Sequence, residues 1–208
     1  MPRGATKTAS VSHPGISGAT YAIIPSAEGD FDASYAVTDE GELAFQEYFV
    51  HRGCEPRITG VRFDGADAAK PSPAFAEALV RADAIVFCPS NPLVSIGPVL
   101  AVPGVYAAIE SFNGPRGAVS PIVGGQALKG PAAKMMAELG QEVSSAGVAQ
   151  GYQGIVDMLV IDNADRDEAS RVEACDMRSL MTTTIMQSVE DKVRLAREVL
   201  DSIERWDG

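Results

Sequence analysis

The stretch from residue 84 to residue 104 constrains the fold of this chain more than any other part of the sequence. It reads AIVFCPSNPLVSIGPVLAVPG, so an apolar run ends abruptly at Pro89 and apolar residues with helical spacing follow from Ser95. This order predicts a buried strand, a polar loop and the first turn of a helix. In open α/β sheets, ligands bind beyond the carboxyl ends of the strands, and a helix N-terminus there favours anions. The stretch therefore predicts an α/β sheet with a candidate anion site.

The rest of the chain repeats this alternation of strands and helices. Further buried strands are predicted at residues 118–123, at 156–161 and near 177–180. Helices are predicted at residues 73–82 with Ser72 as N-cap, up to Ser111 with a break at Pro103, at 132–139, at 166–174 and at 189–206. Strands that alternate with helices of this length are typical of βαβ units. We therefore expect a Rossmann-like three-layer α/β fold with a mainly parallel sheet.

The first third of the chain has a different pattern, which predicts a small β-hairpin region. Strands at residues 34–37 and 44–50 flank the turn-forming residues 38–41, and further strands are expected at 19–25 and 58–63. Phe45 and Phe49 share strand parity, which predicts core packing for both. Residues 1–18 are rich in small and polar residues and are predicted to form a loose leader. Residues 19–208 are then expected to form a single α/β domain.

Composition excludes several classes of function. The net charge of −11 leaves no basic patch for nucleic-acid phosphates. No apolar run reaches the roughly 18 residues of a membrane span, and the N-terminus has no apolar signal-peptide core. The 3 cysteines are most simply reduced thiols of a cytoplasmic protein, and Cys88 is expected to pack inertly at the end of its strand.

Histidine usage disfavours zinc but leaves a hard cation open. The chain has 2 histidines, His13 and His51, far apart in the sequence, whereas oxygen ligands for Mg²⁺ are plentiful. The acidic cluster that begins at Asp162 and includes Asp165 does not have calcium-loop spacing. A solvated helix start is the preferred interpretation of that cluster.

Two loops at successive strand ends carry candidate binding residues. In the first loop, Ser90, Asn91 and Ser95 offer hydrogen-bonding groups, and Gly97 permits close approach of a backbone. Ligand binding and an ordinary Ser-Asn-Pro turn remain equally open for this loop.

The second loop reads SPIVGGQALKGP from residue 120 to residue 131. Gly124 and Gly125 open it after a strand, and Lys129 lies just before a helix. A cation is disfavoured at a helix N-terminus, and an anionic ligand would turn that penalty into attraction. A solvated lysine is the alternative, because most charged side chains are simply exposed. The pairing of the two loops favours an anion site.

Four segments together resemble the 2-phospho-L-lactate transferase family of coenzyme F420 biosynthesis. They are PSNPLVSIGPVLAVPG at 89–104, SPIVGGQALKGPAAKMMAELG at 120–140, FQEYFV at 45–50, and the closing LMTTTIMQSVEDKVRLAREVL. The resemblance covers nearly everything from about Lys7 onward. Family members begin with a strand and a Gly-Gly-Thr-Gly-like loop that this chain lacks, so we expect a domain truncated at its N-terminal side relative to the family.

The resemblance implies a cytoplasmic, Mg²⁺-assisted transferase. It would move a phospho-lactyl, phosphoenolpyruvyl or phosphoglyceryl group from a guanosine diphosphate (GDP) carrier to the deazaflavin Fo, with release of GMP. Lys129 would stabilise charge, and the implied substrate-binding residues are Ser90, Asn91, Pro92, Ser95, Ile96, Gly97, Ser120, Gly124, Gly125 and Gly130. The alternative is a non-catalytic module or inactive fragment that binds GDP or a nucleotide sugar. A homodimer is left open.

Overall fold

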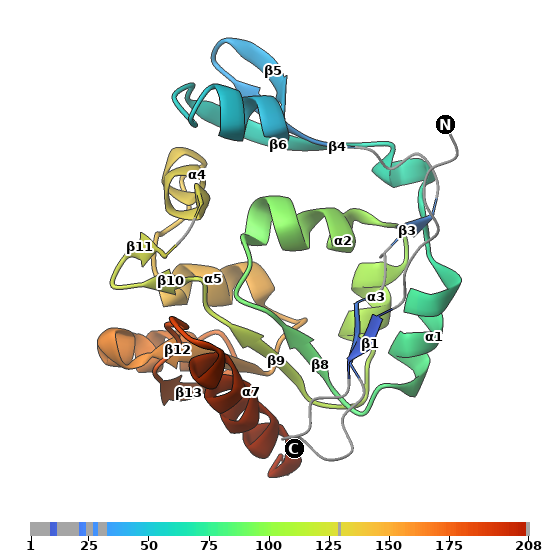
Figure 1. Ribbon diagram of the computed structural model, residues 1–208, viewed down its shortest axis with the longest axis vertical. Helices are drawn as coiled ribbons and strands as arrows, with labels where there is room; N and C mark the ends of the chain where they lie inside the picture. Colours follow the sequence, from blue (N-terminus) through green and yellow to red (C-terminus); the bar gives the residue numbers. More distant parts are fainter. Residues whose placement is uncertain (1–8, 12–20, 24–26, 29–32, 129, 207–208) are drawn as a thin grey trace.

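A four-stranded parallel sheet forms the centre of the molecule (Figure 1). The computed structural model describes residues 9–11, 21–23, 27–28, 33–128 and 130–206. The strand order is β13-β12-β9-β8, formed by β8 (Ile85–Phe87), β9 (Arg116–Val119), β12 (Met158–Asp162) and β13 (Arg178–Thr182). The predicted Rossmann-like α/β class with a mainly parallel sheet is therefore confirmed.

Helices cover both faces of this sheet and make it the middle of three layers. They are α1 (Pro73–Arg81), α2 (Gly97–Ala101), α3 (Val105–Glu110), α4 (Ala132–Glu138), α5 (Ser145–Tyr152), α6 (Ala169–Glu173) and α7 (Val189–Glu204). On one face, Leu195 and Val199 of α7 pack against Val160 of β12. The opposite face carries the larger core, in which helices α3, α5 and α6 contribute Ile109, Val148 and other buried side chains.

Most predicted elements are present with small shifts at their ends. Ser72 caps α1 as expected, because its hydroxyl accepts a hydrogen bond from the Phe75 N–H at 3.2 Å. The helix predicted up to Ser111 is divided into α2 and α3, with Gly104 between them at φ 85°. Four short helical turns complete the set: Glu47–His51, Ala66–Ala68, Pro92–Ile96 and Asn163–Glu168.

A small antiparallel sheet with strand order β5-β4-β6 forms the predicted hairpin region (Figure 1). It consists of β4 (Ala33–Thr38), β5 (Gly41–Ala44) and β6 (Ile58–Asp64). The predicted turn between β4 and β5 is confirmed, and the Thr38 hydroxyl donates to the Gly41 carbonyl across it at 2.8 Å. Three further two-stranded pairings join β1 (Ala9–Val11) to β2 (Tyr21–Ile23), β3 (Ala27–Glu28) to β7 (Lys70–Pro71), and β10 (Ile122–Val123) to β11 (Gln126–Ala127).

The strand predicted at residues 44–50 is wrong. Strand β5 ends at Ala44, and the helical turn Glu47–His51 follows. Residues four apart share a face in a helix as well as in a strand, so the pairing of Phe45 with Phe49 fits both structures. Their rings are stacked with centroids 5.8 Å apart, but Phe49 is 41% exposed, so the core packing predicted for it is wrong. Tyr48 is fully buried in its place. Burial of Tyr48 beneath the hairpin region therefore selects the helix.

Cys88 does not pack inertly, because β8 ends at Phe87 and leaves the Cys88 side chain exposed. All three cysteines are free thiols in the structure, as predicted. The strand predicted at residues 19–25 is present in part as β2, which pairs with β1. Strand β1 lies within the predicted leader at residues 1–18. The other positions of both predictions lie outside the described residues.

Within the described ranges, α7 is the longest helix, and neither it nor any other helix is both long and apolar enough to cross a membrane.

Candidate functional site

The parallel sheet brings the two predicted loops to one edge of the molecule. Strands β8 and β9 are hydrogen-bonded neighbours that run in the same direction, so the chain leaves both strands on the same side. The first loop then contacts α4, the helix that follows the second loop: the Asn91 amide donates to the Met135 sulfur at 3.6 Å. The first loop and the helix that follows the second loop are therefore in contact.

In the first loop, Asn91 organises the backbone. Its side-chain oxygen accepts hydrogen bonds from the N–H groups of Leu93 at 2.9 Å and Val94 at 3.4 Å. Its carbonyl accepts from Ser95 at 3.0 Å and Ile96 at 3.1 Å. Asn91 is therefore the cap of the turn Pro92–Ile96, and its oxygen is already occupied.

The other predicted residues of the first loop differ in accessibility. Ser95 is exposed, so its hydroxyl faces solvent at the edge of the loop. Ser90, Pro92 and Ile96 are half-buried, and the Ser90 N–H donates to the Cys88 carbonyl at 2.7 Å. Ser95 is thus the best exposed candidate for ligand contact in this loop.

Gly97 is required by a protein neighbour. A Cβ atom at this position would lie 3.0 Å from Cζ of Phe63 and 3.2 Å from the Pro92 carbonyl oxygen. Phe63 belongs to β6, so Gly97 lets the small antiparallel sheet approach the first loop. The close approach predicted here is thus made by an aromatic ring.

The second loop forms a feature absent from the predictions, the β10–β11 hairpin. Gly124 and Gly125 are its two turn residues, with φ values of 59° and 71°. Such left-handed values are typical of the type I′ turn that closes two-residue hairpins, and they favour glycine. The Gly124 N–H donates to the Asp165 carboxylate at 2.8 Å.

Three predicted residues of the second loop remain: Ser120, Gly130 and Lys129. Ser120 is 1% exposed, and its hydroxyl donates to the Ile122 carbonyl at 3.0 Å. Gly130 is exposed at φ 70°, with open space where a side chain would stand. Lys129, the predicted charge-stabilising residue, lies outside the described residues. The contacts of these residues with substrate stay predictions.

Helix α4 joins this edge to the small sheet through a polar cluster. The Lys134 ammonium lies 2.7 Å from Glu138 Oε1 and 3.1 Å from the Pro56 carbonyl, and Glu138 Oε2 accepts from the Ile58 N–H at 2.8 Å. Burial disfavours both charges, but the hydrogen bonds prevail: the pKa of Lys134 is raised and that of Glu138 is lowered. The cluster thus keeps both groups ionised and fixes the sheet above α4.

Two carboxylates predicted to be solvated are buried, which corrects the interpretation of the acidic cluster. Asp162 and Asp165 are 6% and 5% exposed. Asp162 accepts from the N–H groups of Ala164 at 3.0 Å and Thr184 at 2.7 Å. Burial alone would raise the pKa of Asp162, but these backbone donors outweigh it and lower the pKa. Asp162 thereby ties β12 to the segment after β13.

These buried acids do not form a metal site. Among residues 33–128 and 130–206, no three His, Cys, Asp or Glu side chains are placed to hold one ion together. The Asp162 and Asp165 oxygens are engaged by protein N–H and O–H groups. The described residues therefore provide no cluster of three protein ligands for Mg²⁺, and no step of a reaction is assigned to it.

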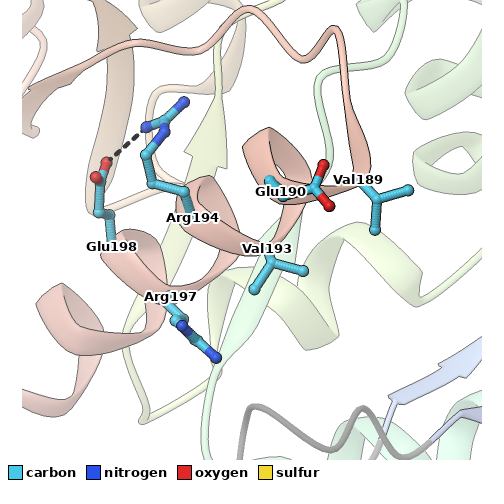
Figure 2. A pocket seen from close by; sticks show the side chains of 6 residues that line it. All are labelled: Val189, Glu190, Val193, Arg194, Arg197 and Glu198. Atoms are coloured by element: carbon cyan, nitrogen blue, oxygen red, sulfur yellow. Dashed lines mark hydrogen bonds and ion pairs between the residues drawn. The ribbon is translucent and has the colours of Figure 1, made fainter.

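A hollow lies along α7, apart from the predicted site residues. Figure 2 shows this cavity of about 540 Å³, which is lined by Val189, Glu190, Val193, Arg194, Arg197 and Glu198. The Arg194 guanidinium forms an ion pair with Glu198 at 3.2 Å, drawn as the dashed line. None of the loop residues lines this cavity. It is therefore a feature of the helix surface.

A parallel sheet with helices on both faces defines an α/β protein with a Rossmann-like fold. Residues 8–198 match the family model described as 2-phospho-L-lactate transferase CofD. The chain belongs to this family.

Curated relatives agree with the family assignment. The chain is 39% identical over 181 residues to the 2-phospho-L-lactate transferase of Methanothermobacter thermautotrophicus, covering 87% of this chain and 57% of the relative. It is 37% identical over 186 residues to the phosphoenolpyruvate transferase of Streptomyces griseus, covering 88% and 58%. The chain thus spans somewhat more than half the length of these relatives.

A solved structure is similar in fold. The crystal structure of protein BH3568 from Bacillus halodurans superposes with a TM-score of 0.54 at 16% identity, covering 80% of this chain and 58% of that one. At this identity, the likeness supports the α/β architecture alone.

Proposed function

We propose that this chain takes part in coenzyme F420 biosynthesis as a phosphotransferase that joins a phosphate-linked three-carbon acid to the deazaflavin Fo. The donor is the acid carried on GDP, and GMP is released. Family membership over residues 8–198 supports the reaction class. The names of the relatives support a lactyl or enolpyruvyl group as cargo, and a glyceryl group is the third candidate.

The observation that supports the proposal is the position of two loops at the same side of the sheet, after adjacent parallel strands. The turn Pro92–Ile96 follows β8, the β10–β11 hairpin follows β9, and α4 contacts the first of them through Asn91 and Met135. Ligands of open α/β sheets bind in this position, where backbone N–H groups and a cation can face a diphosphate.

The proposed reaction is a substitution at phosphorus. The Fo hydroxyl oxygen forms a bond to the phosphorus that bears the three-carbon acid. The bond from that phosphorus to the oxygen bridging to GMP breaks, GMP leaves, and the hydroxyl proton passes to solvent. Negative charge builds on the phosphoryl oxygens and on the leaving GMP, so positive groups at this position accelerate the reaction. We assign this task to Lys129.

Mg²⁺ is proposed as an activator on the ground of the family alone, because the described residues provide no ligand set for it. A divalent ion would neutralise diphosphate charge during transfer. Activity with added Mg²⁺, compared with activity in excess chelator, tests this requirement directly. The cytoplasm is the compartment that we propose for the reaction.

Turnover is the experiment that tests the function. The protein is incubated with Fo, Mg²⁺ and each of the three GDP-linked acids in turn, and the phosphodiester product and GMP are measured by mass spectrometry. Product from one donor identifies the cargo, and Lys129→Ala is expected to slow its formation at least tenfold. Absence of product with all three donors, at protein concentrations that bind GDP, contradicts the transferase function.

A nucleotide-binding role without turnover is the second candidate. The two loops alone would serve this role. The match covers 57% of the first relative, so the rest of that relative has no counterpart in the comparison. Calorimetric titration with GDP, GTP and UDP-sugars separates the candidates. Heat without product supports the binding module, whereas heat with product supports the transferase.

A further inference from the structure

A buried carboxylate stands behind the Gly124–Gly125 turn. Asp165 lies in the turn Asn163–Glu168 after β12, and its side chain is removed from solvent. One of its oxygens accepts from the Gly124 N–H at 2.8 Å, and the other lies 3.5 Å from the Ser145 hydroxyl. These partners are neutral, so the carboxylate binds the turn and the start of α5 to β12.

Two buried hydroxyls hold the entry of the hairpin. The Ser145 hydroxyl has one hydrogen, and its closer neighbour is the Ser120 hydroxyl at 3.0 Å, while Asp165 lies at 3.5 Å. Ser120 donates to the Ile122 carbonyl at 3.0 Å and accepts from the Ile122 N–H at 3.2 Å. Asp165 thus holds the tip of the β10–β11 hairpin through Gly124, and the two serines hold its entry.

This arrangement changes the role of Gly124. Because its N–H group is already engaged by Asp165, that amide is not free to donate to an anionic ligand. Gly124 itself is exposed, so removal of the carboxylate would leave its N–H to water and would release the turn from β12. The carboxylate therefore holds the orientation of the turn.

We propose that Asp165, acting with Ser145 and Ser120, is a positioning residue that holds the Gly124–Gly125 turn in the geometry needed for diphosphate binding. This inference rests on the proposed function. Asp165 makes no contact with the ligand in this proposal. Its carboxylate acts only by holding the β10–β11 hairpin in place.

The experiment compares Asp165→Ala with Asp165→Asn and with Asp167→Ala. Asp167 is exposed and lies two residues away on the same turn, so it is the matched control. The asparagine oxygen can still accept from Gly124, and its amide group can donate to Ser145. The readouts are the Kd for GDP with Mg²⁺, from calorimetry on folded protein, and amide hydrogen exchange of residues 122–127.

We expect Asp165→Ala to weaken GDP binding about tenfold and to speed exchange at Gly124, since its N–H loses its acceptor. Asp165→Asn and Asp167→Ala should remain within about twofold of the wild type. If Asp165→Ala does not fold, Asp165→Leu provides the comparison, because it keeps a side chain of similar size and removes the acceptor of the Gly124 N–H.

The outcomes separate this inference from the proposed function. Wild-type protein that binds GDP, with Asp165→Ala unchanged in Kd and merely lower in melting temperature, overturns the inference and leaves the function in place. Wild-type protein that does not bind GDP overturns the function and this inference with it. Faster exchange at the hairpin together with weaker binding, both restored by asparagine, supports the positioning role.

Discussion

Gly97 shows at the residue scale how a position in a candidate ligand loop can be required by the protein itself. The space that a Cβ atom would need is taken by the Phe63 ring and the Pro92 carbonyl. Gly97→Ala is therefore expected to destabilise the protein by about 1–3 kcal/mol, the usual cost of overpacking. The free energy of unfolding from chemical denaturation measures the effect.

Gly151→Ala is the matched control for that substitution. Gly151 lies in α5 with nothing within 4 Å of its added methyl group, so alanine should leave stability unchanged or raise it by about 0.4–1 kcal/mol. A combined Gly97→Ala and Phe63→Leu variant should recover part of the loss. Equal effects of the two alanines would show that crowding at Phe63 is not the cause.

Lys129 carries a prediction that rests on the sequence. Lys129→Ala should weaken GDP binding about tenfold or more and leave guanosine binding nearly unchanged, because an ammonium attracts the diphosphate and not the nucleoside. Calorimetry with both ligands measures the two affinities, and Lys192→Ala on α7 is a control of equal charge. Equal losses for GDP and guanosine would contradict the assigned role.

The roles of single residues were predicted well where they depend on neighbours in the sequence. They were predicted poorly where they depend on residues far along the chain. Ser72 was identified as a cap from its place before a helix, and the structure agrees. Asn91 and Gly97 were identified as special, but their partners Met135 and Phe63 lie far along the chain, beyond the reach of sequence spacing. Burial of Asp165 likewise depends on a hairpin that the sequence pattern did not predict.

At the scale of elements, Asp162 joins strand β12 to the segment that follows β13. Its carboxylate accepts from both the N–H and the hydroxyl of Thr184, at 2.7 and 3.1 Å. Asp162→Asn places an amide where these donors need an acceptor, so the variant should lose about 2 kcal/mol of unfolding free energy near neutral pH.

The same carboxylate gives a pH dependence with a defined sign. Its pKa is lower in the folded protein than in the unfolded chain, so its stabilisation is present above the unfolded value of about 3.9. It is lost as the pH falls through the lower, folded pKa. Chemical denaturation between pH 7 and pH 3 measures the difference in the free energy of unfolding between wild type and Asp162→Asn. This difference should become smaller below about pH 4. A difference that stays constant would exclude this linkage.

Helices and strands were predicted correctly where one hydrophobic periodicity dominates the sequence. The amphipathic α7 and the apolar β12 were predicted within a few residues. Residues 45–51 were misread because a four-residue spacing suits a strand and a helix alike. Helix α5 was missed because six of its eight residues are buried around its circumference and no polar stripe marks it.

At the scale of the whole molecule, the carboxyl-terminal and amino-terminal ends of the parallel strands form two opposite edges of the sheet, and we expect different roles for them. The carboxyl-terminal side of the strands carries the two candidate loops, and the sequence predicted the parallel strands because strands alternate with helices along the chain. The opposite, amino-terminal edge has no candidate ligand residue among those predicted. Contacts there should therefore support stability alone.

Arg116 tests this division, because it joins three segments at the amino-terminal edge. Its Nε donates to Asp157 at 2.9 Å, and its Nη1 donates to the carbonyls of Ile109 at 3.2 Å and Gly154 at 2.9 Å. Arg116→Ala should cost about 3 kcal/mol of unfolding free energy, since it leaves the Asp157 charge with only the backbone N–H of residue 116 as donor and removes the guanidinium from the Gly154 carbonyl. Arg116→Lys should recover only part of the loss, because one ammonium cannot reproduce the planar set of donors. The Kd for GDP of either folded variant should stay within about twofold of the wild type. If Arg116→Ala weakens GDP binding as strongly as Lys129→Ala does, the two edges are not independent, and the ligand site depends on the whole sheet.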